Sequence, residues 1–428
     1  MLLNHWFQIT GTWLLSALML AAVSSPGNAL SASEKNYRLG VNKQFAVWLK
    51  ALREDAEAQG VSRKKLDRSL RNVRLNWRLP NLRPPGRKPK AKAPNWQAEF
   101  RSPGPYFKQS YINSLVGSGR KHLAGQKGQL AAIEKTYGVP AGILLGIWAK
   151  ETSYGRAKIP YNAIHTLATL GFMSERPEFF RKELLAALKI VQKGKIPAAR
   201  MKSAWSGAMG HPQFMPSAYL KHAVDQDGDG KPDIWKSLPD TLASIANFLK
   251  QSGWKGRGWG YEVVLPSGFD CTLEGPDKRR PISEWVKLGV KRSFGRSFSA
   301  AQLKQHGSIL LPAGTHGPAF VALKNFYVLK EYNESDLYAL FVGHLADRYG
   351  KNRTFEGKWG KVGGLTRGDT LDMQKRLVKR GYNVGGVDGL IGFRSRVAAG
   401  AYAKSQGLKP TCYPGKALVK HIRKSTPL

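Results

Sequence analysis

The chain has 428 residues and is strongly basic, with 68 lysines and arginines against 29 aspartates and glutamates, which gives a formal net charge of +39. Its length allows two or three domains with cores of their own, and its 42% of hydrophobic residues is ordinary for a globular protein. Beyond the N-terminus no apolar segment is long enough to span a membrane, which excludes a protein built of several membrane spans. The charge favours a polyanionic partner, and nucleic acid, an anionic membrane surface and an acidic cell-wall polymer all fit it.

The N-terminus resembles an export signal. Residues 12–23 form an apolar run of signal-peptide length, shorter than the roughly 20 residues of a membrane span, and Pro26 and Gly27 follow it. His5 is the only basic side chain before the run, so an uncleaved anchor stays an alternative. We expect residues 1–31 to be a signal peptide that directs the protein to the periplasm.

Apolar residues recur with helical spacing along most of the chain. We expect helices in residues 42–60, 62–73, 129–151, 239–254 and 335–350. Extended segments are expected at residues 259–269 and 318–333, and a basic, proline-rich excursion at residues 79–96. The glycine- and lysine-rich residues 351–364 indicate a linker before a small C-terminal module, residues 365–428.

A carboxylate lies on the apolar stripe of one predicted helix. Leu144, Ile147, Trp148 and Glu151 share one helical face in the sequence GILLGIWAKETSYGR. Burial disfavours the charged form, so the pKa of Glu151 should rise, as a general acid at neutral pH requires. The alternative is a structural glutamate that is paired with Arg156.

A second unusual stretch is WSGAMGHPQFMPSAYLKHAVD, residues 205–225. Gly207 and Gly210 permit close approach of the backbone, and Gln213 is a polar residue inside an apolar turn. Pro216 can begin a helix. The alternative is a purely structural turn beside a helix.

These two stretches, IWAKETSYGR and GAMGHPQFMPSAY, resemble the lytic murein transglycosylases related to the membrane-bound type B enzyme. The resemblance runs from about Asn36 to Tyr349 and includes IEKTYGVP, GDGKPDIW, ASIANFLKQSGW and NFYVLKEYN. It implies a mainly α fold, with an α+β lysozyme-like catalytic domain at residues 36–350. It also implies cleavage of the MurNAc–GlcNAc bond of peptidoglycan with a 1,6-anhydro-muramic product.

The resemblance also implies site residues. Glu151 matches the single catalytic acid, which protonates the glycosidic oxygen and then takes the proton of the C6 hydroxyl that attacks C1. Ala204 stands where many relatives carry a serine. The residues implied to contact substrate are Met209, Gln213, Phe214, Tyr332 and Asn333.

The segment DQDGDGKPDIWK, residues 225–236, has the spacing of an EF-hand-type loop. The position of the bidentate acid, the twelfth, is occupied by Lys236. We expect no required cofactor, and any Ca²⁺ in this loop to be structural; the alternative is an Asp/Gly turn held by its own hydrogen bonds. The candidate ligands are Asp225, Asp227, Asp229 and Asp233.

The C-terminal residues 365–428 resemble a small three-helix peptidoglycan-binding module. The resemblance rests on a helix that ends in a Gly-Tyr turn, followed by VDGxxG and a second helix, and the matching residues are Gly381, Tyr382, Asp388, Gly389 and Gly392. A second wall contact raises the effective concentration of an enzyme on an insoluble polymer. The two cysteines, Cys271 and Cys412, either pair in the exported protein or remain separate thiols.

The leading hypothesis is therefore an exported, monomeric lytic transglycosylase that acts on glycan strands. The basic composition is also compatible with residence at the membrane surface. A hydrolytic muramidase and a wall-binding protein with an impaired site are the alternatives. A nucleic-acid binder is disfavoured by the signal segment and by the lack of a recognisable nucleic-acid module.

Overall fold

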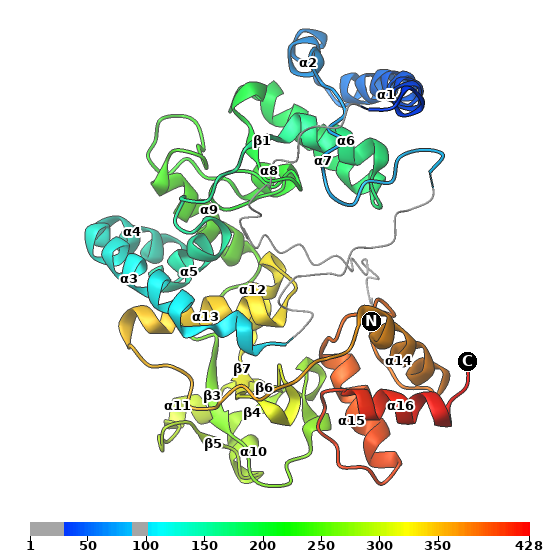
Figure 1. Cartoon of the computed structure of the whole chain (residues 1–428). Coiled ribbons are helices and arrows are strands. Elements are labelled where there is room, and N and C mark those ends of the chain that lie inside the picture. Colours follow the sequence, from blue (N-terminus) through cyan, green and yellow to red (C-terminus); the bar gives the residue numbers. More distant parts are fainter. Residues whose placement is uncertain (1–29, 88–101) are drawn as a thin grey trace, which may run out of the picture.

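The computed structural model describes residues 30–87 and 102–428. Most of the expected signal peptide, residues 1–29, and residues 88–101 of the proline-rich region lie outside the described residues. Figure 1 shows the described chain as four groups of elements. Each group has a hydrophobic core of its own.

The first group is helical and lies at the top of Figure 1, where its helices share one core. Its helices are α1 (Ala32–Ala58), α2 (Arg63–Leu70), α6 (Ala163–Met173), α7 (Pro177–Gln192) and α8 (Pro216–His222). A two-stranded antiparallel sheet, β1 (Tyr161–Asn162) with β2 (Lys202–Ser203), accompanies them.

The second group surrounds α5 and forms the largest core. Gly138 ends the helix before α5 in a left-handed conformation (φ +72°), and Pro140 caps the start of α5. The members of this group are α3 (Gln109–Gly125), α4 (Lys127–Tyr137), α5 (Ala141–Thr152), α9 (Leu238–Gln251), α12 (Lys324–Tyr332) and α13 (Asp336–Gly350).

The third group is an antiparallel five-stranded sheet in the order β4-β6-β7-β3-β5, below α12 and α13 in Figure 1. The strands are β3 (Gly260–Val264), β4 (Arg280–Pro281), β5 (Lys291–Arg292), β6 (His306–Leu310) and β7 (Ala319–Ala322), with short helices α10 (Ile282–Lys287) and α11 (Ala300–Leu303).

The C-terminal module is the fourth group and contains three helices, α14 (Arg367–Lys379), α15 (Phe393–Ser405) and α16 (Lys416–Ser425). Thr366 and Asp369 form a capping box at the start of α14. A disulfide between Cys271 and Cys412 joins the module to the sheet group. The cysteines therefore pair, which settles the alternative left open by the sequence.

The predicted helices are confirmed, but the extended segment at 318–333 is only partly so. The strand β7 ends at Ala322, and Lys324–Tyr332 form α12. Phe326 and Leu329 are buried at helical spacing, and the buried Asn325 amide donates to two backbone carbonyls. A short apolar run is compatible with a strand and with a buried helix, so the pattern of residues 318–333 could not distinguish α12 from an extended segment.

Residues 351–364 contain no helix or strand, but they pack against the protein. Phe355 and Trp359 lie on the largest core, and the Gly357 N–H donates to Glu262 Oε1 at 2.9 Å. The segment therefore follows the surface of the second and third groups before it enters the module.

Within the described ranges, no single helix is long and apolar enough to cross a membrane. The pair α4 and α5 meets the length and composition criteria together, but the two helices are bent by 106° at their junction.

Candidate active site

The last turn of α5 carries Glu151 at the wall of a cavity of about 200 Å³ between the first and second groups. Leu144, Ile147 and Trp148, which share its stripe, are at most 3% exposed. The predicted burial is confirmed for these three apolar residues, and Glu151 at the end of the stripe is half-buried. The other residues that line the cavity are Phe179, Phe180, Ser206, Ala208, Gln213, Met215, Glu331, Tyr332, Asn333 and Glu334.

Glu151 accepts one hydrogen bond from a buried tyrosine. The Tyr338 hydroxyl on the first turn of α13 donates to Glu151 Oε1 at 2.6 Å. Burial raises the pKa of Glu151 to about 7, against the smaller opposing effects of the Tyr338 hydrogen bond and the Lys150 charge. A carboxyl with this pKa exists in both protonation states near neutral pH, so it can donate a proton and take one back.

Arg156 is not the partner of Glu151. Its exposed side chain donates to the Ser153 carbonyl at 3.0 Å, and its guanidinium lies 6.0 Å from the ring of Tyr154. The structural alternative, a buried Glu151–Arg156 ion pair, is therefore not what the structure contains.

The glycine-rich turn faces Glu151 across the cavity. Gly210 has φ +64°, and a Cβ there would lie 2.6 Å from the Ile234 carbonyl oxygen, so the predicted close approach is confirmed. Gln213 lines the cavity with φ +54° and donates through Nε2 to the Gly210 carbonyl at 2.7 Å. Its buried Oε1 has no partner among the described residues, which leaves an acceptor for a sugar N–H or hydroxyl.

Met209 and Phe214 were expected to line the cleft, and the structure places them in the core instead. Their backbones bond to each other at 2.7 and 3.0 Å, and their side chains are 0% and 3% exposed. Phe214 packs against Phe248 and Tyr332. Because apolar residues alternate with the turn residues here, the sequence could not tell which side chains face inward; neighbouring Ala208 and Met215 line the cavity.

The turn after α12 supplies the opposite wall. Tyr332 and Asn333 both line the cavity, as the resemblance implied for a polar pair facing the site. The Tyr332 hydroxyl donates to the Pro212 carbonyl at 2.6 Å, which ties this wall to the glycine-rich turn. Asn333 Oδ1 accepts from the Ser335 N–H at 3.1 Å.

Sequence reasoning missed Tyr338, although a signal existed. A hydroxyl on the apolar stripe of residues 335–350 needs a buried partner, and the stripe carries this tyrosine. Ser206 was also not predicted as a site residue. It lines the cavity, and its hydroxyl lies two residues after Ala204, the position at which many relatives carry a serine. The cavity residues Phe179 and Phe180 carry no local pattern that marks them.

The acidic loop brings together three of its four predicted ligands. Oxygen atoms of Asp225, Asp227 and Asp229 all lie within 4.8 Å of one another. Asp233 instead accepts the backbone N–H groups of Trp235 and Lys236. With a lysine at the twelfth position, the residues present do not complete an EF-hand ligand set.

A buried aspartate already stabilises this loop. Asp240, at the start of α9, accepts N–H bonds from Gln226, Asp227 and Asp233 at 2.7–3.3 Å. These carboxylate-to-backbone bonds therefore hold the loop against the start of α9.

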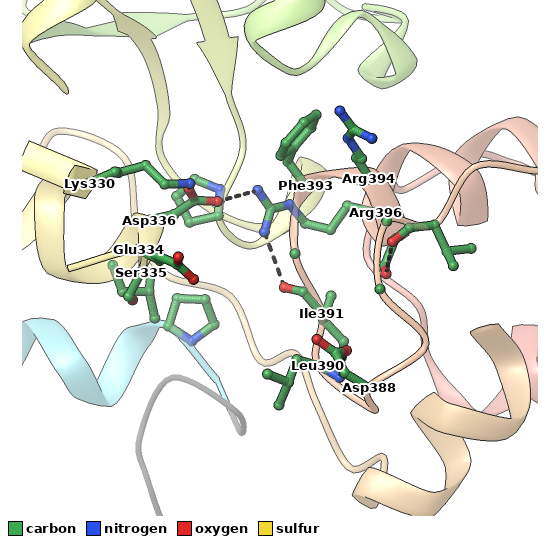
Figure 2. Close-up of a pocket in the computed structure, with 18 of the residues that line it drawn as sticks. Lys330, Glu334, Ser335, Asp336, Asp388, Leu390, Ile391, Phe393, Arg394 and Arg396 are labelled. Atoms are coloured by element: carbon green, nitrogen blue, oxygen red, sulfur yellow. Dashed lines mark hydrogen bonds and ion pairs between the residues drawn. The ribbon is translucent and has the colours of Figure 1, made fainter. Parts of the chain in front are cut away.

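A second, larger cavity of about 550 Å³ separates the α12–α13 turn from the C-terminal module (Figure 2). Glu331 and Glu334 line both cavities, so the two are neighbours on either side of this turn. In Figure 2 Arg394 points away from Asp336, whereas Arg396 points toward it.

Comparison with known proteins agrees with this geometry. Residues 44–347 match the family model of the Transglycosylase SLT domain. The membrane-bound lytic murein transglycosylase B of Escherichia coli is 34% identical over 220 residues, which are 49% of this chain and 57% of that protein. The chain thus spans little more than half the length of this relative.

Solved structures extend the likeness into the C-terminal module. SltB3 from Pseudomonas aeruginosa, in complex with NAG-NAM-pentapeptide, has a TM-score of 0.80 and 38% identity over 89% of this chain and 99% of that one. The Escherichia coli lytic transglycosylase Slt35, in complex with calcium, has a TM-score of 0.50 and 29% identity over 60% of this chain and 81% of that one. The chain therefore belongs to the transglycosylase SLT domain family, the family of the lytic transglycosylases that it resembles.

Proposed function

We propose that the protein is an exported lytic transglycosylase that cleaves the MurNAc–GlcNAc β-1,4 bond of peptidoglycan strands. The observation that carries the proposal is Glu151, a half-buried carboxyl on the wall of a cavity, whose pKa desolvation raises to about 7. The similar SltB3 was solved with NAG-NAM-pentapeptide, which supports a peptidoglycan substrate for this chain as well.

Glu151 acts twice in the proposed reaction. Its proton passes to the glycosidic oxygen as the C1–O bond breaks, and the resulting carboxylate takes the proton of the C6 hydroxyl as O6 bonds to C1. The product carries a 1,6-anhydro-MurNAc end, and no water is consumed. Gln213 and Asn333 provide polar groups that hold the sugar N-acetyl and hydroxyl groups.

The proposed organisation assigns residues 36–350 to catalysis and 365–428 to wall binding, with residues 1–31 as the export signal. The likeness to a membrane-bound murein enzyme supports a periplasmic localisation. The Cys271–Cys412 disulfide also supports it, because disulfides persist in oxidising compartments. The positive charge matches the carboxylates of the stem peptides. We infer a monomer that needs no metal, so prolonged dialysis against a chelator should leave activity unchanged.

Mass spectrometry of purified murein digested with the wild type and with Glu151→Gln tests the assignment. We expect anhydro-muropeptides from the wild type and a loss of at least about 10³-fold in the variant, because the amide can neither donate nor accept the proton. Equal product from the two proteins would remove Glu151 from the mechanism.

The second candidate function is a hydrolytic muramidase. It is favoured by two further carboxylates, Glu331 and Glu334, which line the same cavity and are exposed. Hydrolases with two carboxylates use the second one for water or as nucleophile. Free reducing muramic ends in the same mass spectra would select this reaction, whereas anhydro ends exclude it.

A further inference from the structure

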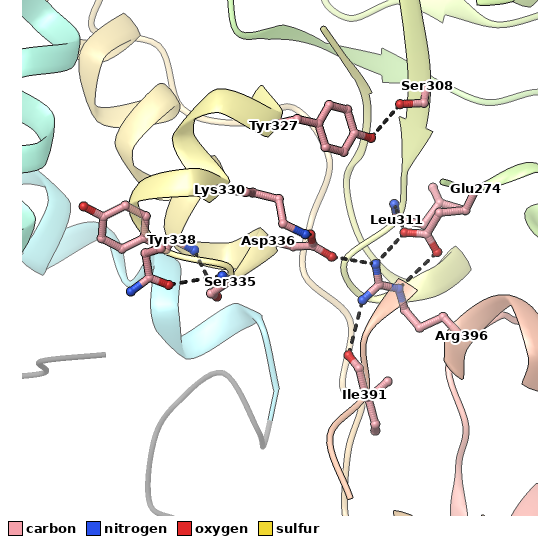
Figure 3. A network of polar contacts seen from close by, with 11 residues as sticks. Glu274, Ser308, Leu311, Tyr327, Lys330, Ser335, Asp336, Tyr338, Ile391 and Arg396 are labelled. Carbon is pink, nitrogen blue, oxygen red and sulfur yellow. Dashed lines mark hydrogen bonds and ion pairs between the residues drawn. The ribbon is translucent and has the colours of Figure 1, made fainter. Parts of the chain in front are cut away.

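The C-terminal module inserts one buried arginine between the sheet group and α13 (Figure 3). Arg396 of α15 donates from Nε and Nη2 to the two carboxylate oxygens of Glu274 at 3.0 and 2.5 Å. Nη2 also donates to Asp336 Oδ2 at 3.1 Å. The side chains of Arg396 and Glu274 are 4% and 0% exposed, so the contact is closed to solvent.

Asp336 is the first residue of α13, and it is bonded on two sides. Lys330 of α12 donates to Asp336 Oδ1 at 2.6 Å, while Arg396 occupies the other oxygen. Burial pushes the pKa of Asp336 up, but the Lys330 and Arg396 charges outweigh it and hold that pKa at about 2. The carboxylate is therefore ionised at every working pH and fixes the start of α13 between α12 and the module.

The same first turn of α13 holds the candidate catalytic acid. Tyr338 lies two residues after Asp336, and its hydroxyl donates to Glu151. Ser335 caps this turn by accepting the Tyr338 N–H at 3.3 Å, and Asn333 in turn accepts the Ser335 N–H. A shift of Asp336 must therefore move both the tyrosine that holds Glu151 and the asparagine on the cavity wall.

We propose that Arg396 is a positioning residue for Glu151: the module, through Arg396 and Asp336, sets the place of the α13 turn from which Tyr338 orients the catalytic acid. The module is then a working part of the active site in addition to any contact with the wall. This proposal rests on the proposed function of Glu151.

The decisive variant is Glu274→Gln with Arg396→Met. Glutamine keeps an acceptor for the Leu311 N–H, which Glu274 Oε1 binds at 2.9 Å, and Asp336 keeps its ion pair with Lys330. No buried charge is left unpaired, so the fold should persist. Arg394→Met, an exposed arginine two residues away on the same helix, is the matched control.

The readouts are kcat, KM and the pH profile on soluble glycan strands. We expect kcat to fall about 10-fold with KM nearly unchanged, because misplacing a reacting group costs rate more than binding. The alkaline limb should move to higher pH, because the Tyr338 hydrogen bond lowers the pKa of Glu151 and is weakened. The variant changes none of the titratable groups that the described part of the chain places against Glu151. These are Lys150 of α5, Tyr332 of α12, Tyr338 of α13, and Glu331 and Glu334 at the rim.

A double-mutant cycle with Tyr338→Phe separates positioning from general loosening. If Arg396 acts through Tyr338, the Glu274→Gln/Arg396→Met pair should have little further effect on kcat in the Tyr338→Phe background. Arg396→Lys keeps the charge and should recover part of the activity. Wild-type kcat and pH profile in the folded double variant, or effects that simply add to Tyr338→Phe, would overturn the proposal.

The proposal and the function of Glu151 fail in different ways. Product from Glu151→Gln equal to wild type would refute the function itself. An inactive Glu151→Gln together with an unchanged Glu274→Gln/Arg396→Met variant would refute only the positioning role.

Discussion

The candidate active-site cavity and the module interface lie on two sides of the first turn of α13, and each holds a half-buried carboxylate in a different way. Glu151 receives one bond from a neutral tyrosine, and burial raises its pKa to about 7. Asp336 is bonded by Lys330 and Arg396, whose charges hold its pKa at about 2 despite burial. Burial alone therefore does not decide the protonation state; the charge of the partner does. A neutral donor leaves a carboxyl free to exchange protons, whereas cations fix it as a structural anion.

The largest effect on stability should come from removing Arg396, the cation that binds Glu274 and Asp336 at the module interface. Arg396→Met alone leaves Glu274 without its buried cation and Asp336 with only Lys330. We expect the free energy of unfolding to fall by about 3–4 kcal/mol, the usual cost of removing one partner of a buried pair. Urea unfolding at pH 7 measures it, with Arg394→Met as the control. A loss no greater than that of the control would mean that the buried contact contributes little.

Removal of the Glu151 carboxyl should change the free energy of unfolding in the opposite direction. Glu151 is ionised in the unfolded chain above pH 4.5 but is protonated in the folded protein up to about pH 7, so it destabilises the fold progressively between these values and fully above them. Glu151→Gln should raise the free energy of unfolding by about 2–3 kcal/mol at pH 8 and leave it unchanged at pH 4. Urea unfolding at both pH values gives the answer, and a gain that is equal at pH 4 would point to packing instead of ionisation.

The sequence predicted the surroundings of Glu151 better than the ionic contact at the module interface. The stripe of Leu144, Ile147 and Trp148 placed Glu151 on a buried face, because helical periodicity is local. The Arg396–Glu274 pair joins residues 122 positions apart, and no local pattern marks such a contact. For the same reason the sequence predicted a small module separated from the catalytic domain by a linker. The structure instead joins the module to the sheet group by the buried Arg396–Glu274 ion pair and by a disulfide.

Tyr338→Phe tests the contact that connects the two regions. Without the hydroxyl, the Glu151 carboxylate loses its hydrogen-bond donor, so the pKa of Glu151 should rise further and the alkaline limb of the kcat profile should move up. We expect kcat at pH 7 to fall about 10-fold, because the acid is no longer oriented. An unshifted alkaline limb would show that a group other than Glu151 controls it.

The smallest effect should come from the carboxylates at the cavity rim. Glu331 and Glu334 are exposed, so water screens their charges. If Glu151 serves as both acid and base, Glu331→Gln and Glu334→Gln should each keep activity within about 3-fold of wild type and still yield anhydro ends. If either were the second carboxylate of a hydrolase, its amide would lose about 10²-fold or more. Rates of murein solubilisation for the two variants therefore decide whether this cavity works with one carboxylate or two, and hence whether the protonation state set by Tyr338 and burial is sufficient for the reaction.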